Sequence, residues 1–145
     1  MMSAGLFVPI KVVPDFQSLL KELFKFLSDF FISASQLRFS VNLGGGGELI
    51  DSLVFVYDQE HELLCWVSFM EASEDSRESL EADLPIVAQV TRSSKNNMLF
   101  SVAVACAIGK SFGGRAIYDD ARVYFDCEKN IYTFFEAEEY LSTKL

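Results

Sequence analysis

The stretch NNMLFSVAVACAIGKSF, residues 96–112, decides the fold of this 145-residue chain. Its apolar side chains lie all the way round a helical projection, which is typical of a helix that other elements bury on most sides. Gly113 and Gly114 follow and favour a left-handed stop, and Lys110 in the last turn complements the negative end of the helix dipole. The β-branched residues leave a strand as the alternative. The stretch therefore predicts a buried helix.

Residues 15–31, DFQSLLKELFKFLSDFF, predict a second helix. At about 100° per residue its apolar side chains occupy one sector roughly 160° wide, and the polar residues between them fall outside it. Asp15 follows Pro14 and is a plausible N-cap, because its carboxylate can accept a hydrogen bond from an unpaired N–H of the first turn. The apolar face is wide enough to lie on a sheet.

Four segments in the middle of the chain predict that sheet. LRFSVNL, residues 37–43, alternates strictly between apolar and polar side chains, as a half-buried strand does. After the glycine run at 44–47, LVFVYD at 53–58 and LLCWVSFM at 63–70 indicate two strands around a polar turn, and IVAQVT at 86–91 indicates a fourth. The short connections favour an antiparallel meander.

The last part of the chain is predicted less completely. RAIYDDARVYF, residues 115–125, indicates one or two short strands. Thr133 and Glu136 have the spacing of a capping box, which predicts a last helix through about residue 143. The stretch IYTFF, residues 131–135, leaves an extended strand as the alternative.

The size and composition of the chain agree with one domain. Half of the residues are hydrophobic and 14 are Phe, so a chain of 145 residues has ample material for a core. We predict a single globular domain spanning residues 1–145, of the α+β class. Its antiparallel sheet has four to six strands, is covered by the 15–31 and 96–112 helices, and is joined by a short C-terminal helix as an option.

The formal net charge of −9 excludes a nucleic-acid-binding protein, because such proteins present Lys and Arg to phosphates. It suits a protein with a basic partner, although acidity can also serve only to keep a Phe-rich domain in solution. The odd number of cysteines favours a reducing compartment. We see no signal peptide, and the longest apolar run is shorter than the about 20 residues that a membrane span needs. We therefore expect a cytoplasmic protein without a membrane partner.

Two motifs invite comparison with nucleotide-binding proteins. The tripeptide Gly-Lys-Ser at 109–111 is how a phosphate-binding loop ends, but the loop's first glycine is replaced here by Val104. The tripeptide also ends the predicted helix, where carbonyls rather than amides face outward. The glycine run at 44–47 fails the dinucleotide pattern, because Leu49 stands where its last glycine should be. Neither motif predicts a nucleotide site, and we expect no cofactor.

Other residue types that carry catalysis are scarce. His61 is the only histidine, and it lies between two glutamates without the spacing of a transition-metal site. The cysteines lie in apolar segments or beside acidic residues that disfavour a thiolate, and they are Cys65, Cys106 and Cys127. We therefore expect no metal and no enzyme. A small enzyme that combines His61 with Asp119 and Asp120 stays as an alternative.

The acidic residues concentrate in two segments. Residues 71–83 hold six carboxylates and one arginine, and residues 119–139 hold seven carboxylates and two basic residues. Clustered like charges repel one another, and this repulsion is offset only when a cationic partner binds. The ordinary interpretation of such a segment is a solvated loop. The candidate partner-binding residues are Glu71, Glu74, Asp75, Glu78, Glu81, Asp83, Asp119, Asp120, Glu138 and Glu139.

GGRAIYDDARVYF, preceded by SVAVACAIGKSF, resembles the small acidic bacterial immunity proteins of polymorphic-toxin systems. In these proteins a helix of small residues ends at Gly-Gly and is followed by a strand and an Asp-Asp turn. The resemblance covers residues 94–135. It is too general to indicate a particular family or to assign a function to any single residue. It implies a non-enzymatic inhibitor that plugs the active site of a secreted toxin acting in the cytoplasm.

A nuclease fits this resemblance best, because carboxylate clusters suit a cleft that is basic to hold phosphates. An NAD-consuming or peptide-modifying toxin stays open. The partner is then a basic protein, and the chain itself is a monomer or a weak homodimer. The alternative is an adaptor or secretion chaperone that binds through an apolar face, so that its affinity hardly responds to salt.

Overall fold

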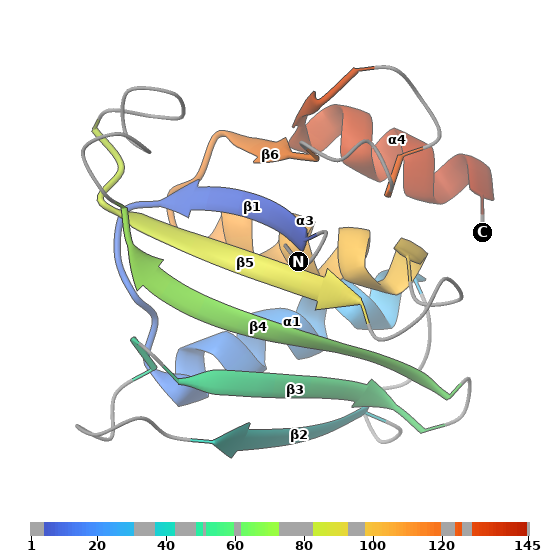
Figure 1. The fold of residues 1–145 in the computed structure, drawn as a ribbon. Coiled ribbons are helices and arrows are strands. Elements are labelled where there is room, and N and C mark those ends of the chain that lie inside the picture. Colours follow the sequence, from blue (N-terminus) through green and yellow to red (C-terminus); the bar gives the residue numbers. More distant parts are fainter. Residues whose placement is uncertain are drawn as a thin grey trace.

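The computed structural model shows a curved sheet with helices packed behind it (Figure 1). It describes residues 5–30, 37–42, 49–50, 52–59, 62–72, 83–92, 98–119, 124–125 and 129–144. These residues form three helices and a seven-stranded antiparallel sheet. The predicted α+β class is confirmed, and the sheet has more strands than the four to six predicted.

The middle of the chain forms the predicted meander. β2 (Leu37–Asn42), β3 (Leu53–Asp58), β4 (Leu63–Glu71) and β5 (Ile86–Arg92) pair in chain order, each antiparallel to the next. Their bounds agree with the predicted segments to within one residue.

The sequence does not predict β1 (Gly5–Ile10), which lies inside the sheet between β5 and β6 (Ala116–Tyr118). β7 (Ile131–Thr133) completes the order β2-β3-β4-β5-β1-β6-β7. Most of β1 is buried, so it lacks the alternation of a half-exposed strand. Its proline also disfavours a central strand, but Pro9 is opposite Val87 of β5 only, because β6 pairs with β1 at Phe7 alone.

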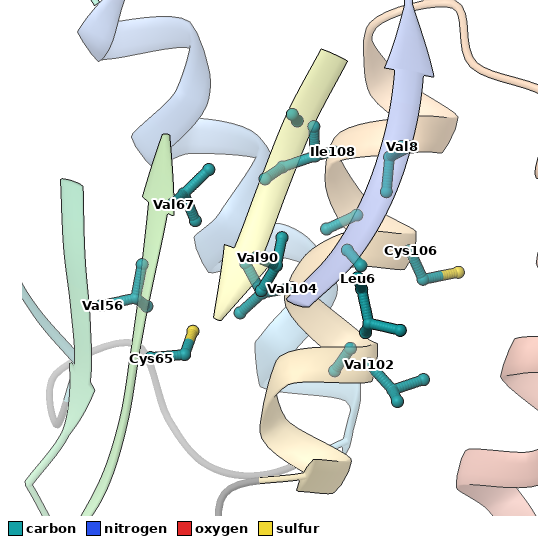
Figure 2. Packing of buried hydrophobic residues seen from close by; sticks show 14 of the residues in the cluster. Leu6, Val8, Val56, Cys65, Val67, Val90, Val102, Val104, Cys106 and Ile108 are labelled. Carbon is teal, nitrogen blue, oxygen red and sulfur yellow. The ribbon is translucent and has the colours of Figure 1, made fainter. Parts of the chain in front are cut away.

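The helix that decides the fold is α3 (Met98–Ser111), and residues 100–109 of it are all buried. It packs on β1, β4 and β5 and contacts both α1 (Phe16–Phe30) and α4 (Phe134–Lys144). Figure 2 shows Leu6 of β1 and Val90 of β5 beside Val104 of this helix. The prediction of a buried helix is confirmed, and the strand alternative is wrong.

The predicted stop of this helix is also present. Gly113 has φ 84°, in the left-handed region. The Gly114 N–H donates to the carbonyl of Gly109 (2.8 Å), and the Phe112 N–H donates to that of Ile108 (3.0 Å). The Gly-Lys-Ser tripeptide therefore lies at a helix C-terminus, where carbonyl groups gather.

Both remaining helices begin at their predicted caps. Asp15 Oδ1 accepts the N–H of Ser18 (2.8 Å) at the start of α1. The capping box of α4 is reciprocal: the Glu136 N–H donates to Thr133 Oγ1 (3.1 Å), and the Thr133 N–H donates to Glu136 Oε1 (2.9 Å). The strand β7 ends at Thr133, so this stretch contains a short strand and then the helix.

The helices lie on one side of the sheet. Leu19, Leu23 and Leu27 of α1 join α3 in the core, and Phe24 of α1 meets Phe39 of β2 edge to face, with ring centroids 5.0 Å apart. Ala137 and Leu141 hold α4 against the same core. In the described part of the chain, no helix covers the opposite face of the sheet (Figure 1).

Candidate protein-binding surfaces

The first acidic segment, 71–83, is the connection between β4 and β5. Glu71 lies opposite Ile86 in the last pair of the ladder, and the Ala72 N–H donates to the carbonyl of Pro85 (2.8 Å). The connection therefore leaves and re-enters the sheet at one point. Glu71 is exposed there. Glu74, Asp75, Glu78 and Glu81 lie outside the described residues.

Asp83, at the end of this connection, is held by an internal ion pair. Two nitrogens of the Arg115 guanidinium bind its two carboxylate oxygens, with 2.7 Å between Nη1 and Oδ1. The hydrogen bonds from Arg115 lower the pKa of Asp83 to about 2. Its side chain is 61% exposed, so the pair contributes little to stability. The pair removes much of the charge that Asp83 could offer to a partner.

This ion pair predicts a pH effect on stability. The unfolded state binds the Asp83 proton more tightly, because the folded pKa of about 2 lies below the ordinary value of 3.8. The stabilisation is therefore present above pH 3.8 and is lost as the pH falls through 2. Urea unfolding of wild type and Asp83→Asn between pH 5 and pH 2 should show the wild type losing more stability. A Glu139→Gln control should follow the wild type, and parallel curves for Asp83→Asn would contradict the prediction.

Asp119 was predicted as a partner contact in the second acidic segment, 119–139, and its burial argues against that role. Asp119 is fully buried. Its Oδ2 accepts the backbone N–H groups of Tyr124 (2.9 Å) and Phe125 (3.0 Å), and its own N–H donates to the carbonyl of Asn130 (2.8 Å). One carboxylate oxygen thus satisfies the backbone donors of Tyr124 and Phe125, which gives Asp119 a structural role.

The C-terminal acidic residues divide into paired and exposed ones. Glu138 accepts a hydrogen bond from Lys110 Nζ (2.8 Å), and this bond raises the pKa of Lys110. Glu136 caps α4 and pairs with Lys129. Glu139 is exposed. The predicted second patch therefore keeps Glu139, while Glu138 is partly neutralised and Asp120 lies outside the described residues.

The enzyme alternative gains no assembled site. The Asp119 carboxylate is occupied by backbone donors, and His61 and Asp120 lie outside the described residues. Burial raises the pKa of the Cys65 thiol and raises that of Cys106 to about 12, so both stay protonated. Within the described ranges, no group of three or more His, Cys, Asp or Glu side chains could hold a metal ion.

A cavity of about 430 Å³ lies between α1, the C-terminal end of α3 and Glu138 of α4. Three carboxylates and two lysines line it, and Ser111 Oγ donates to Glu22 Oε2 (3.2 Å). Its lining consists of Glu22, Lys25, Phe26, Asp29, Lys110, Ser111 and Glu138. The mixed charge gives the cavity no preference for an anion or a cation.

The sheet face opposite the helices carries a surface that the sequence interpretation did not include. Side chains that alternate with the buried ones point to this side and are half-buried. Phe55 and Trp66 are opposite each other in the ladder, with ring centroids 6.4 Å apart. We call it the outer sheet face, and its apolar members are Phe7, Leu53, Phe55, Tyr57, Leu64, Trp66 and Met70.

This composition is unusual for a sheet face without helices. An antiparallel sheet with one open face usually carries polar side chains there. β2 follows that rule with the exposed Arg38 and Ser40, whereas β3 and β4 do not. The sequence shows this feature in LVFVY and LLCW, where residues at odd and at even positions are apolar, so both sides of the strand carry apolar side chains. Ser68 and Gln89 lie among these side chains on the same face. Apolar side chains gathered on an uncovered sheet face are a candidate interaction site.

None of the described helices reaches the length and apolar character that crossing a membrane requires. Scans against protein-family models, curated proteins and solved structures found no significant match.

Proposed function

We propose that this protein is a non-enzymatic immunity protein. It binds a cognate secreted bacterial toxin that acts in the cytoplasm and occludes the toxin's active site, with a nuclease as the best fit. The observation that supports this proposal is the acidic β4–β5 connection, which holds six of the chain's carboxylates between two neighbouring strands with a closed base. A loop on a rigid base is a common place for binding residues.

The charge of the chain supports a basic partner. At a net charge of −9 it attracts a positively charged protein over distances of about a Debye length, roughly 8 Å at physiological salt. Such attraction raises the association rate more than the affinity. The proposal retains Glu71, Glu74, Asp75, Glu78, Glu81 and Glu139 as contacts, gives Asp83 and Glu138 a reduced role because of their ion pairs, leaves Asp120 untested, and removes Asp119.

Reversing the charge of the acidic connection should slow binding. In the triple variant Glu74→Lys, Asp75→Lys and Glu78→Lys, the association rate with the toxin should fall at least about tenfold at low salt, because the steering field is lost. Stopped-flow mixing over a series of salt concentrations measures this rate. Reversal of Asp29, an exposed carboxylate of α1 on the helical side, is the control. Unchanged association in the triple variant would remove the connection from the mechanism.

The immunity role itself is tested in cells. The protein encoded beside this chain's gene is expressed as the candidate toxin, alone and together with this chain. Co-expression should restore growth, and the purified complex should lack the toxin's activity. Growth arrest that persists despite a stable complex would exclude an occluding inhibitor.

One observation favours the second candidate, an adaptor or secretion chaperone: the outer sheet face is apolar rather than acidic. A partner bound through that face alone should show an affinity that changes little with salt, because apolar burial is not screened. The salt series therefore separates the two functions.

A further inference from the structure

We propose that the outer sheet face is the centre of the interface with a basic protein, and that the exposed Glu71 at the end of β4 lies at its charged edge. The inference rests on the proposed function in one respect, the positive charge of the partner. It assigns the binding surface, which the acidic residues by themselves do not.

The size of this face suits a protein partner. Five neighbouring strands, β2 to β5 and β1, form this side of the sheet, and its apolar members lie on β1, β3 and β4. With strands about 4.8 Å apart and about 3.4 Å per residue, this side of the five strands spans roughly 20 by 20 Å. A standard interface buries about 800 Å² on each partner, and its centre is apolar while its edge is polar. The outer sheet face has the dimensions and the character of such a centre.

Trp66 is placed to be its anchor. It lies on β4, the third of the five strands, with Phe55 opposite it on β3 and Thr91 opposite it on β5. Tryptophan and tyrosine near the middle of an interface carry most of the binding energy. Arginine or lysine of a basic partner can stack on the indole ring, which is the best aromatic acceptor for a cation.

Charge determines the occupant and its orientation. Two copies of a chain with net charge −9 repel each other, whereas a basic protein is attracted. Met70 of the face lies next to Glu71, where the acidic connection begins, and the exposed Arg38 lies at the opposite end beside Tyr57. The partner's basic residues therefore face the Met70 end, and its neutral or acidic residues face Arg38.

Site-specific photocrosslinking identifies what covers this face. Benzoylphenylalanine is introduced at Phe55 in the full chain, which is expressed in its native host and irradiated, and each adduct is sequenced. The matched control carries the same group at Phe135 of α4, which is 72% exposed on the helical side. We expect an adduct with one basic protein from Phe55 and none from Phe135. An adduct with a second copy of this chain, or no adduct at Phe55, would overturn the inference.

The sequenced partner is then purified for binding measurements. Trp66→Ala should raise its Kd about 30-fold or more, as truncation of an interface anchor does, whereas Phe135→Ala should change it less than about twofold. Circular dichroism and urea unfolding confirm that both variants stay folded. Because Trp66 is the only tryptophan, fluorotryptophan labelling of the wild type gives one signal from this chain, which should shift when unlabelled partner is added.

These outcomes separate the surface from the function. If Trp66→Ala weakens binding but the partner is no toxin, the interface stands and the immunity role falls. If the partner is a neutralised toxin and Trp66→Ala binds like wild type, the immunity role stands and the interface assignment falls.

Discussion

Replacing Asp119 with alanine should lower the free energy of unfolding by about 3 kcal/mol or more. The Asp119 carboxylate accepts two backbone N–H groups in the interior, from Tyr124 and Phe125. Alanine leaves both donors unsatisfied, at about 1–3 kcal/mol each. The loss is large because Tyr124 and Phe125 are both aromatic residues of the core. Phe125 stacks on Tyr132, with ring centroids 3.8 Å apart.

The matched control for this variant is Asp119→Asn. Its side-chain oxygen can accept the same two bonds without a charge, so the expected loss is smaller, about 1 kcal/mol. Urea unfolding at neutral pH measures both. Stability within 0.5 kcal/mol of the wild type in Asp119→Ala would contradict the structural role and return the residue to the list of candidate contacts.

Whether Gly109→Ala destabilises or stabilises the folded protein should depend on the Phe134 ring. A Cβ at Gly109 would lie 2.3 Å from the Phe134 ring and 3.0 Å from Val8 Cγ1, so the variant pushes α4 away from α3. Overpacking of this kind typically destabilises by about 1–3 kcal/mol. The expected loss is about 2 kcal/mol, although alanine is intrinsically the better helix former by up to about 1 kcal/mol.

A double-mutant cycle with Phe134→Ala tests this contact. Phe134→Ala alone should lose about 2–4 kcal/mol by leaving a cavity. In that background the ring is gone, so Gly109→Ala should be neutral or stabilising by up to about 1 kcal/mol. Thermal unfolding of the four proteins gives the coupling. Additive losses of stability would show that contact with the Phe134 ring is not the reason why alanine is unfavourable at Gly109.

The parts of the fold that the sequence predicts are those with local signals. The 15–31 helix, its Asp15 cap, and the meander of β2 to β5 all follow from side-chain periodicity and nearby turns. The 96–112 helix was predictable because apolar side chains surround it. β1 was missed, because five of its six residues are buried and so show no alternation, and because Pro9 disfavours a central strand unless a neighbour is absent on one side.

The candidate site was predicted less well, for a physical reason. Sequence shows that a residue is acidic but not what its oxygens bind. Asp119 binds backbone donors, Asp83 binds Arg115, and Glu138 binds Lys110, and these partners lie 5 to 32 positions away in the chain. The sequence shows that β3 and β4 carry apolar residues at both odd and even positions. It does not show which side of the sheet the helices cover, so the outer sheet face could be recognised only from the structure.

Because β1 lies inside the sheet, the order in which the chain is synthesised limits when the sheet can form. This strand leaves the ribosome before the other strands, yet the residues that pair with it, 86–92 and 116–118, are made much later. Its leucine, valine and isoleucine side chains therefore have no native strand partner while β2, β3 and β4 are being made. β1 can therefore pair in its native register only after residues 86–91 are made, and the sheet can be completed only after residues 131–133 are made.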